Sequence, residues 1–235
     1  MNYKLIVSGV CVFISSWMYA QSESKKEKNF HKTLYATTTM QINQLKNGAL
    51  LVRLKTNALA LEALRKSGKE QQANALERNQ AEINRNILEA FQGKFKFCSV
   101  YFFFSNYSEA VKNKTFDRVV FLNDNLQPDS TIKFTKGTFL VADFGVIEQD
   151  TARYAENTLI IPDDNFSVKQ SKTYYGGPSF GYEGLIIRSD ALVQLRHPFP
   201  YFVRTYDSKL KKKVVNHAVR KMNKKLNHFY NKRSV

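Results

Sequence analysis

The amino-acid sequence predicts an α/β or α+β fold built on one mixed β-sheet, with a helical excursion near the N-terminus and a basic amphipathic helix at the C-terminus. Helix-forming patterns lead in the first part of the chain, interrupted by one strand pattern, whereas short runs rich in Val, Ile and Phe dominate the second half. A stretch near the C-terminus then places apolar residues at helical spacing. With 235 residues, of which 43% are hydrophobic, the chain is long enough to bury a core.

The first twenty residues have the pattern of a secretory signal peptide. Lys4 precedes an apolar run, Leu5–Ala20, and polar residues follow at once. The alternative is a membrane anchor, but this run includes three serines and is shorter than the ~20 residues that a bilayer core requires. We therefore expect cleavage near Ala20, a mobile lead-in over residues 21–36, and a single globular domain over residues 37–235 that has no transmembrane segment.

Helix and strand signals alternate in the first part of the expected domain. The predicted elements are a helix over residues 37–46, a strand over 49–55, a helix over 58–66 and, after a break at Ser67, a second helix that runs to about Phe91. Thr37, Thr38 and Thr39 are candidate caps for the first helix, and Gly93 is the expected cap at the end of the last one. Ser67-Gly68-Lys69-Glu70 matches a capping box, which predicts a break between the second and third helices.

Residues 95–104 form the most apolar strand pattern in the chain. An exposed edge strand of this composition would promote aggregation, so we expect the strand to be central and covered on both faces. A strand, a helical excursion and a second buried strand favour a crossover connection between two parallel strands.

Further strand patterns follow in the second half. They cover residues 118–122, 138–147, 158–161, 185–188, 191–196 and 199–205, with 185–188 and 191–196 expected to pair as a hairpin across Ser189-Asp190. Residues 210–230 are predicted to form the C-terminal helix.

The C-terminal region carries most of the net positive charge. The formal charge of the chain is +16, and loss of Lys4 with the signal peptide leaves +15. Residues 208–235 contain ten Lys or Arg residues and no acid, and their apolar stripe is expected to dock on the domain while the cations face water. The candidate polyanion-binding residues are Lys211, Lys212, Lys213, Lys224 and Lys225. The alternative is a solvated face that serves only solubility.

A segment rich in Tyr and Gly, residues 174–184, is a candidate ligand-binding loop. Tyr174, Tyr175 and Tyr182 could stack on a sugar or an aromatic ligand and donate hydrogen bonds from their hydroxyls. The glycine spacing does not match a phosphate-binding loop. The alternative is a turn whose aromatic side chains cover the end of the sheet.

Three charged residues in or near the predicted strands are further ligand-binding candidates. Asp143 interrupts an apolar strand, so its carboxylate is either on the solvent face or buried and paired. Glycoside hydrolysis requires two carboxylates in one cleft, and Asp143 with Glu183 is the pair to test. Arg188 lies close to them in the pattern. The alternative is that all three have structural roles.

Cys98 is the single cysteine that remains after signal cleavage, so no intramolecular disulfide is expected. Its position in the most apolar strand predicts an inert, buried thiol. The histidines are too widely spaced to share an ion, and the sequence predicts neither a metal site nor a cofactor. No catalytic residue is assigned.

These observations predict an exported, periplasmic or secreted, soluble basic protein of unknown activity that binds an anionic envelope surface or glycan through its C-terminal helix. The expected partners are an anionic glycan, lipopolysaccharide or a membrane surface, and export argues against nucleic acid. The alternative is a secreted, glycosidase-like hydrolase with a pocket under the loop at 174–184. Whether the protein is an enzyme stays open.

Overall fold

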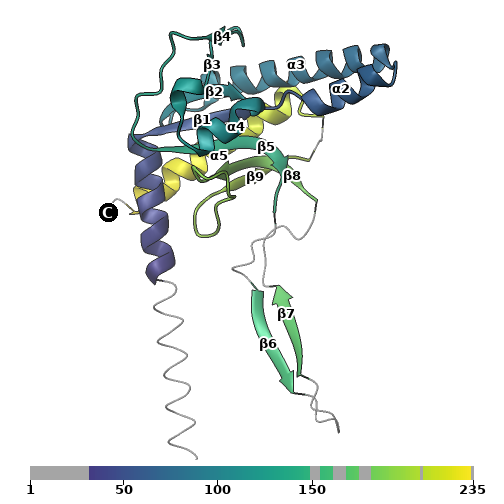
Figure 1. The fold of residues 1–235 in the computed structure, drawn as a ribbon. Coiled ribbons are helices and arrows are strands. Elements are labelled where there is room, and N and C mark those ends of the chain that lie inside the picture. The colour runs from purple at the N-terminus through teal and green to yellow at the C-terminus, as the bar shows by residue number, and fades with distance from the viewer. Residues whose placement is uncertain (1–31, 149–153, 161–167, 175–180, 207–208, 234–235) are drawn as a thin grey trace, which may run out of the picture. The chain divides into compact units, whose positions relative to one another are not determined.

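A computed structural model describes residues 32–148, 154–160, 168–174, 181–206 and 209–233 (Figure 1). The predicted signal peptide lies outside the described residues, as does most of the predicted lead-in. The chain divides into two units, Met1–Gln41 and Ile42–Val235, which are described separately. Within the described ranges, no helix is both long enough and apolar enough to cross a membrane.

Residues 32–41 of the first unit are helical, so the helix begins before Thr37. The hydroxyls of Thr37, Thr38 and Thr39 donate hydrogen bonds to the carbonyl oxygens four residues earlier. They therefore lie inside a helix and do not cap its start, so the capping prediction was wrong. In the second unit the helical conformation continues over residues 42–47 and stops at the predicted Gly48. A Cβ atom on this glycine would lie 2.2 Å from the Thr138 carbonyl oxygen, which explains why a glycine is required there.

The second unit contains a seven-stranded mixed sheet, and the predicted fold class is confirmed. Its strands, in spatial order, are β4 (Pro128–Asp129), β3 (Phe121–Leu122), β2 (Ser99–Phe104), β1 (Ala49–Leu54), β5 (Phe139–Val146), β8 (Glu183–Arg188) and β9 (Phe202–Arg204). β1 pairs in parallel with both β2 and β5, and the other pairs are antiparallel. The apolar run at 95–104 therefore contributes a central parallel strand, as predicted, although the strand begins only at Ser99.

The helical excursion between β1 and β2 consists of α2 (Ala58–Lys66) and α3 (Glu70–Lys94). The predicted break is present, and Gly68 relieves it with φ of +70°. The capping-box prediction was wrong, because the Ser67 hydroxyl donates to the carbonyl of Leu64 at the end of α2. Gly93 lies within α3 and does not cap it.

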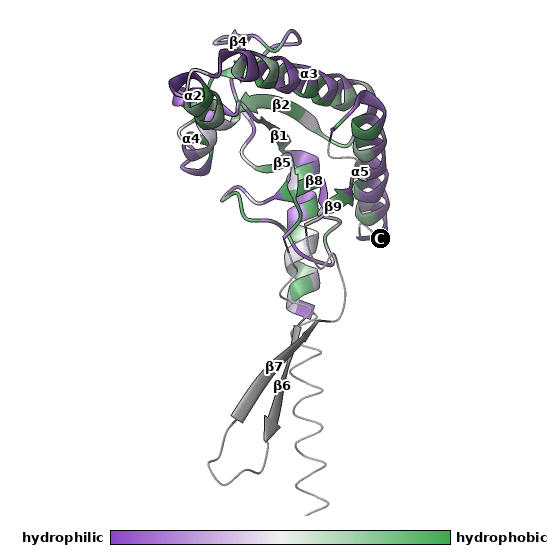
Figure 2. Cartoon of the chain, turned by 90° about the vertical axis from the view of Figure 1, so that its right-hand side faces the viewer, coloured by the Kyte–Doolittle hydropathy of each residue, from purple (hydrophilic) through white to green (hydrophobic). Residues whose placement is uncertain are grey.

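Two apolar clusters cover the opposite faces of the sheet. On one face, α3 and α5 (Lys212–Arg233) pack against alternate strand residues that include Leu50, Val52 and Leu140. On the other face, α4 (Ser108–Lys112) packs against Leu51 and Val141 with the aromatic residues of the second cluster. Figure 2 shows the central strands coloured largely as hydrophobic, whereas α3 and α5 carry both hydrophilic and hydrophobic residues. The connections on the two sides of β1 thus follow opposite faces of the sheet.

Two strand predictions in the second half were incomplete. The pattern at 158–161 belongs to a longer strand, β6 (Tyr154–Ile160), which pairs with β7 (Val168–Tyr174) in a separate two-stranded sheet. The predicted second arm at 191–196 is not a strand, since it contributes a single bridge from Gln194 to Arg188. β8 instead pairs with β9.

Candidate functional site

Helix α5 is anchored by the apolar residues that the sequence placed on one stripe. Val215, Ala218, Val219, Met222 and Leu226 are all buried in the main core. Lys211, Lys212, Lys213 and Lys224 are exposed. Lys225 differs from the other candidate cations, because its Nζ donates to the Phe202 carbonyl oxygen at 2.9 Å and lies over the Phe202 ring. Burial, and then the charge of Lys221, lower the pKa of Lys225.

The first turns of α5 border an open groove of about 850 Å³. Its walls come from the end of α3, the end of β9 with the residues that follow, and the start of α5. The basic lining residues are Lys94, Arg204, Lys212, Lys213, Arg220 and His217. Among the described residues no Asp or Glu lines this groove, which we call the basic groove. The helix dipole adds to its positive potential, because the N-terminal end of α5 opens onto it.

Arg204 has the most defined geometry in the basic groove. Its guanidinium lies 3.1 Å from the centre of the Tyr182 ring and 5.1 Å from that of Tyr206. Among the described residues, its Nε atom is buried without a hydrogen-bond partner. Stacking on an aromatic face holds a guanidinium in a fixed plane, which suits fork-like binding of a carboxylate, sulfate or phosphate group.

Two further residues determine how the basic groove meets a ligand. Tyr206 is 86% exposed, so its ring is available for stacking on a flat ligand surface. Lys212 forms an ion pair with Glu89 at 2.7 Å. The hydrogen bond from Lys212 and then its charge lower the pKa of Glu89. Lys213 and Arg220, by contrast, are exposed and have no ion pair within the described chain.

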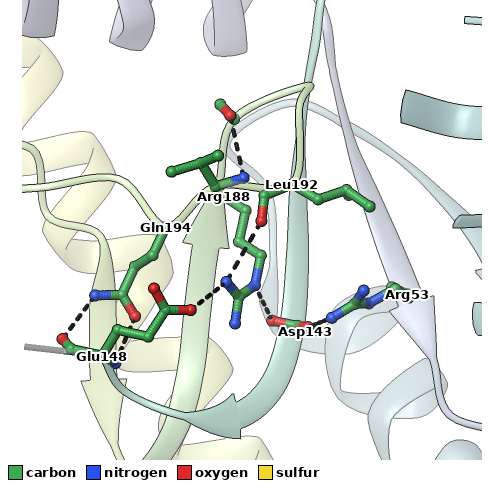
Figure 3. Close-up of polar contacts among 8 residues, drawn as sticks. Arg53, Asp143, Glu148, Arg188, Leu192 and Gln194 are labelled. Atoms are coloured by element: carbon green, nitrogen blue, oxygen red, sulfur yellow. Dashed lines mark hydrogen bonds and ion pairs between the residues drawn. The ribbon is translucent and has the colours of Figure 1, made fainter. Parts of the chain in front are cut away.

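Asp143 and Arg188 lie together in a paired cluster, on the face of the sheet to which Val141 also points (Figure 3). Asp143 is only 2% exposed, and its two carboxylate oxygens accept hydrogen bonds from Arg53 and Arg188. Arg188 also binds Glu148 at 3.0 Å. Burial alone would lower the pKa of Arg188, but the two carboxylates raise it above its ordinary value. We call these four residues the arginine–carboxylate cluster.

The structure does not bring Asp143 and Glu183 together. In the pairing of β5 with β8, Asp143 lies opposite Ile186 and Glu183 lies opposite Val146. Facing residues on adjacent strands share a side of the sheet, and residues three apart along a strand point to opposite sides. The two carboxylates therefore have no common cleft, and nothing in the geometry favours the hydrolase alternative.

The structure describes only some of the remaining residues that the sequence singled out. Tyr182 contributes to the basic groove through its contact with Arg204. Tyr175 lies outside the described residues, and only the backbone of Tyr174 is described. Burial raises the pKa of the Cys98 thiol to about 12, which makes the thiol a poor nucleophile. The described residues contain no group of three or more His, Cys, Asp or Glu side chains arranged to hold a metal ion.

Sequence reasoning missed Lys94, Arg204 and Tyr206, which complete the basic groove. Comparison of the chain with known proteins identifies no matching family model, no matching curated protein and no matching solved structure.

Proposed function

We propose that the protein is exported and binds an acidic saccharide of the cell envelope in the basic groove. One observation carries the proposal: the groove gathers five Lys or Arg side chains and a histidine around about 850 Å³, with no acid among its described lining residues. Cations that serve only solubility would not be expected to gather around one groove.

The lining matches the two kinds of group that an acidic saccharide presents. The cations bind carboxylate, sulfate or phosphate substituents, and stacked Arg204 is oriented for a two-pronged contact. Tyr206 supplies an exposed ring for the flat apolar face of a sugar. Because the groove is open to solvent, its electrostatic contribution is screened by salt.

Export is the second part of the proposal and rests on the signal-peptide pattern of residues 1–20. Mass spectrometry of the protein from its native host tests this part, and the expected mature chain begins at Gln21. Recovery of the full-length chain from the cytosol would contradict it.

Binding is tested with two probes that share the chemistry but differ in source: heparin, as a free acidic glycan, and purified lipopolysaccharide. Neutral dextran is the control polymer. We expect heparin or lipopolysaccharide to bind with an affinity that falls steeply with ionic strength, and dextran not to bind. Heparin binding without lipopolysaccharide binding would identify free glycan as the ligand class, and the reverse would identify the envelope lipid headgroup.

A matched pair of variants locates the site. Lys213→Gln/Arg220→Gln removes two cations from the basic groove, whereas Lys224→Gln/Lys232→Gln removes two exposed cations from the same helix outside it. We expect the first variant to weaken binding by about tenfold or more, since hydrogen bonds to charged groups contribute ~1.5–3 kcal/mol each. The second should change affinity by less than about threefold. Equal losses in both variants would mean that the whole helix surface binds and the groove does not.

A further inference from the structure

A second, smaller cavity lies at the carboxyl ends of the parallel strands β1 and β5. Its volume is about 190 Å³. In the sheet, β1 lies between β2 on one side and β5 on the other. Open α/β sheets bind their ligands outside the carboxyl ends of their strands.

Residues of opposite charge are among those that line this cavity. Lys55 follows β1 directly, and Glu183 opens β8, two strands away in the sheet. Two strand spacings amount to about 10 Å. Within the described chain, neither side chain takes part in an ion pair. Arg53 also lines the cavity, but its guanidinium is bound to Asp143.

Two buried amide side chains of α3, those of Gln80 and Asn84, also line this cavity. Gln80 accepts a hydrogen bond from Asn57 at 2.7 Å and donates one to Asn84 at 2.9 Å. Asn84 in turn donates to the Lys55 carbonyl oxygen. An amide nitrogen carries two protons, so each of these side chains keeps one donor beyond the bonds described. The network fixes both amides and ties them to the backbone that carries Lys55.

We propose that this cavity binds a small zwitterion, such as a free amino acid. Its carboxylate contacts Lys55 and the remaining amide donors, its ammonium group contacts Glu183, and its side chain lies against Ile83, Ile87 and Phe144. The volume corresponds to about six water molecules, which suits a small amino acid. The cavity and the basic groove share no lining residue, so this site is independent of the proposed glycan binding.

The experiment is an NMR titration of the folded protein that follows the side-chain amide signals of Gln80 and Asn84. The probes are L-alanine, L-serine and L-leucine, each up to about 10 mM, which covers millimolar affinities. Propionate and ethylamine are matched controls, because each carries one of the two charges of L-alanine. We expect saturable shifts with at least one amino acid and no more than one-tenth of its affinity for either control.

Two variants complete the test. Glu183→Gln and Lys55→Gln should each weaken amino-acid binding by about tenfold, while Glu82→Gln, an exposed residue of α3 outside the cavity, should leave it unchanged. Circular dichroism and thermal unfolding check the folding of all three variants. Unshifted amide signals with every amino acid, or an unchanged affinity in Glu183→Gln, would overturn the proposal whatever the basic groove binds.

Discussion

The arginine–carboxylate cluster and the basic groove both gather cationic side chains, but only in the cluster does every cation have a carboxylate partner. Arg53 and Arg188 share the buried carboxylate of Asp143, and Glu148 adds a second negative charge. In the basic groove, only Lys212 forms an ion pair with an acid among the described residues, and that acid is Glu89. The comparison teaches that cations on this chain are structural where an acid is buried with them and available for ligands where none is.

The difference has a physical cause in solvation. A buried charge is stable only with a partner, and removal of one partner leaves the other uncompensated. Exposed cations stay solvated without partners and can exchange water for an anionic ligand. Variants at the two sites should therefore affect different properties.

The largest expected effect is at Asp143. Asp143→Ala leaves Arg53 and Arg188 without their shared carboxylate and should lower the free energy of unfolding by about 3–5 kcal/mol, measured by urea denaturation. Asp190→Ala, which breaks the exposed pair with Lys114, is the matched control and should cost less than about 1 kcal/mol. Equal losses for the two variants would remove the distinction between buried and exposed charges.

A glycine substitution tests whether the basic groove depends on the sheet beneath it. A Cβ atom on Gly184 would lie 2.5 Å from the Val203 carbonyl oxygen, next to Arg204. Gly184→Ala should therefore lower the free energy of unfolding by about 1–3 kcal/mol and weaken heparin binding. Gly93→Ala, in α3 with open space around it, should stabilise the protein by up to about 1 kcal/mol. Unchanged binding in a destabilised Gly184→Ala protein would show that the position of Arg204 is unimportant.

The smallest expected effect concerns Lys225, the half-buried cation of α5. Because its pKa is lowered in the folded protein, the unfolded chain binds more protons at pH values between that pKa and the ordinary value of about 10.4. Stability should therefore rise with pH through this window, and Lys225→Met should remove that part of the increase. Urea unfolding at about pH 8 and pH 10 measures it. Lys224→Met, at the exposed neighbour, should retain the wild-type pH dependence.

The elements that the sequence predicts well are those whose signal is local. β1, α2 and α5 were recognised because their apolar spacing and flanking residues lie within a few turns of the chain. β7 was missed because polar residues dominate it, and β6 was predicted only from Thr158 onward, after its polar residues Glu156 and Asn157. The second arm at 191–196 fails as a strand where Leu192 adopts a φ of +63°, which apolar patterning does not reveal.

The candidate sites are less predictable for a different reason. The basic groove joins Lys94, Arg204 and Lys213, which are far apart in the sequence and meet only through the packing of α3, β9 and α5. Whether Asp143 and Glu183 share a cleft depends on the register of β5 with β8. Neither long-range packing nor register follows from residue spacing, so the sequence identified the basic helix and could not identify the groove.

The most direct test of the account is NMR observation of the arginine Nε–H signals during titration with a short heparin oligosaccharide. The account predicts shifts for Arg204 and Arg220 in the basic groove and none for Arg53 and Arg188, whose guanidinium groups are held by carboxylates. Shifts at Arg53 and Arg188, or heparin binding that leaves Arg204 and Arg220 unchanged, would contradict it.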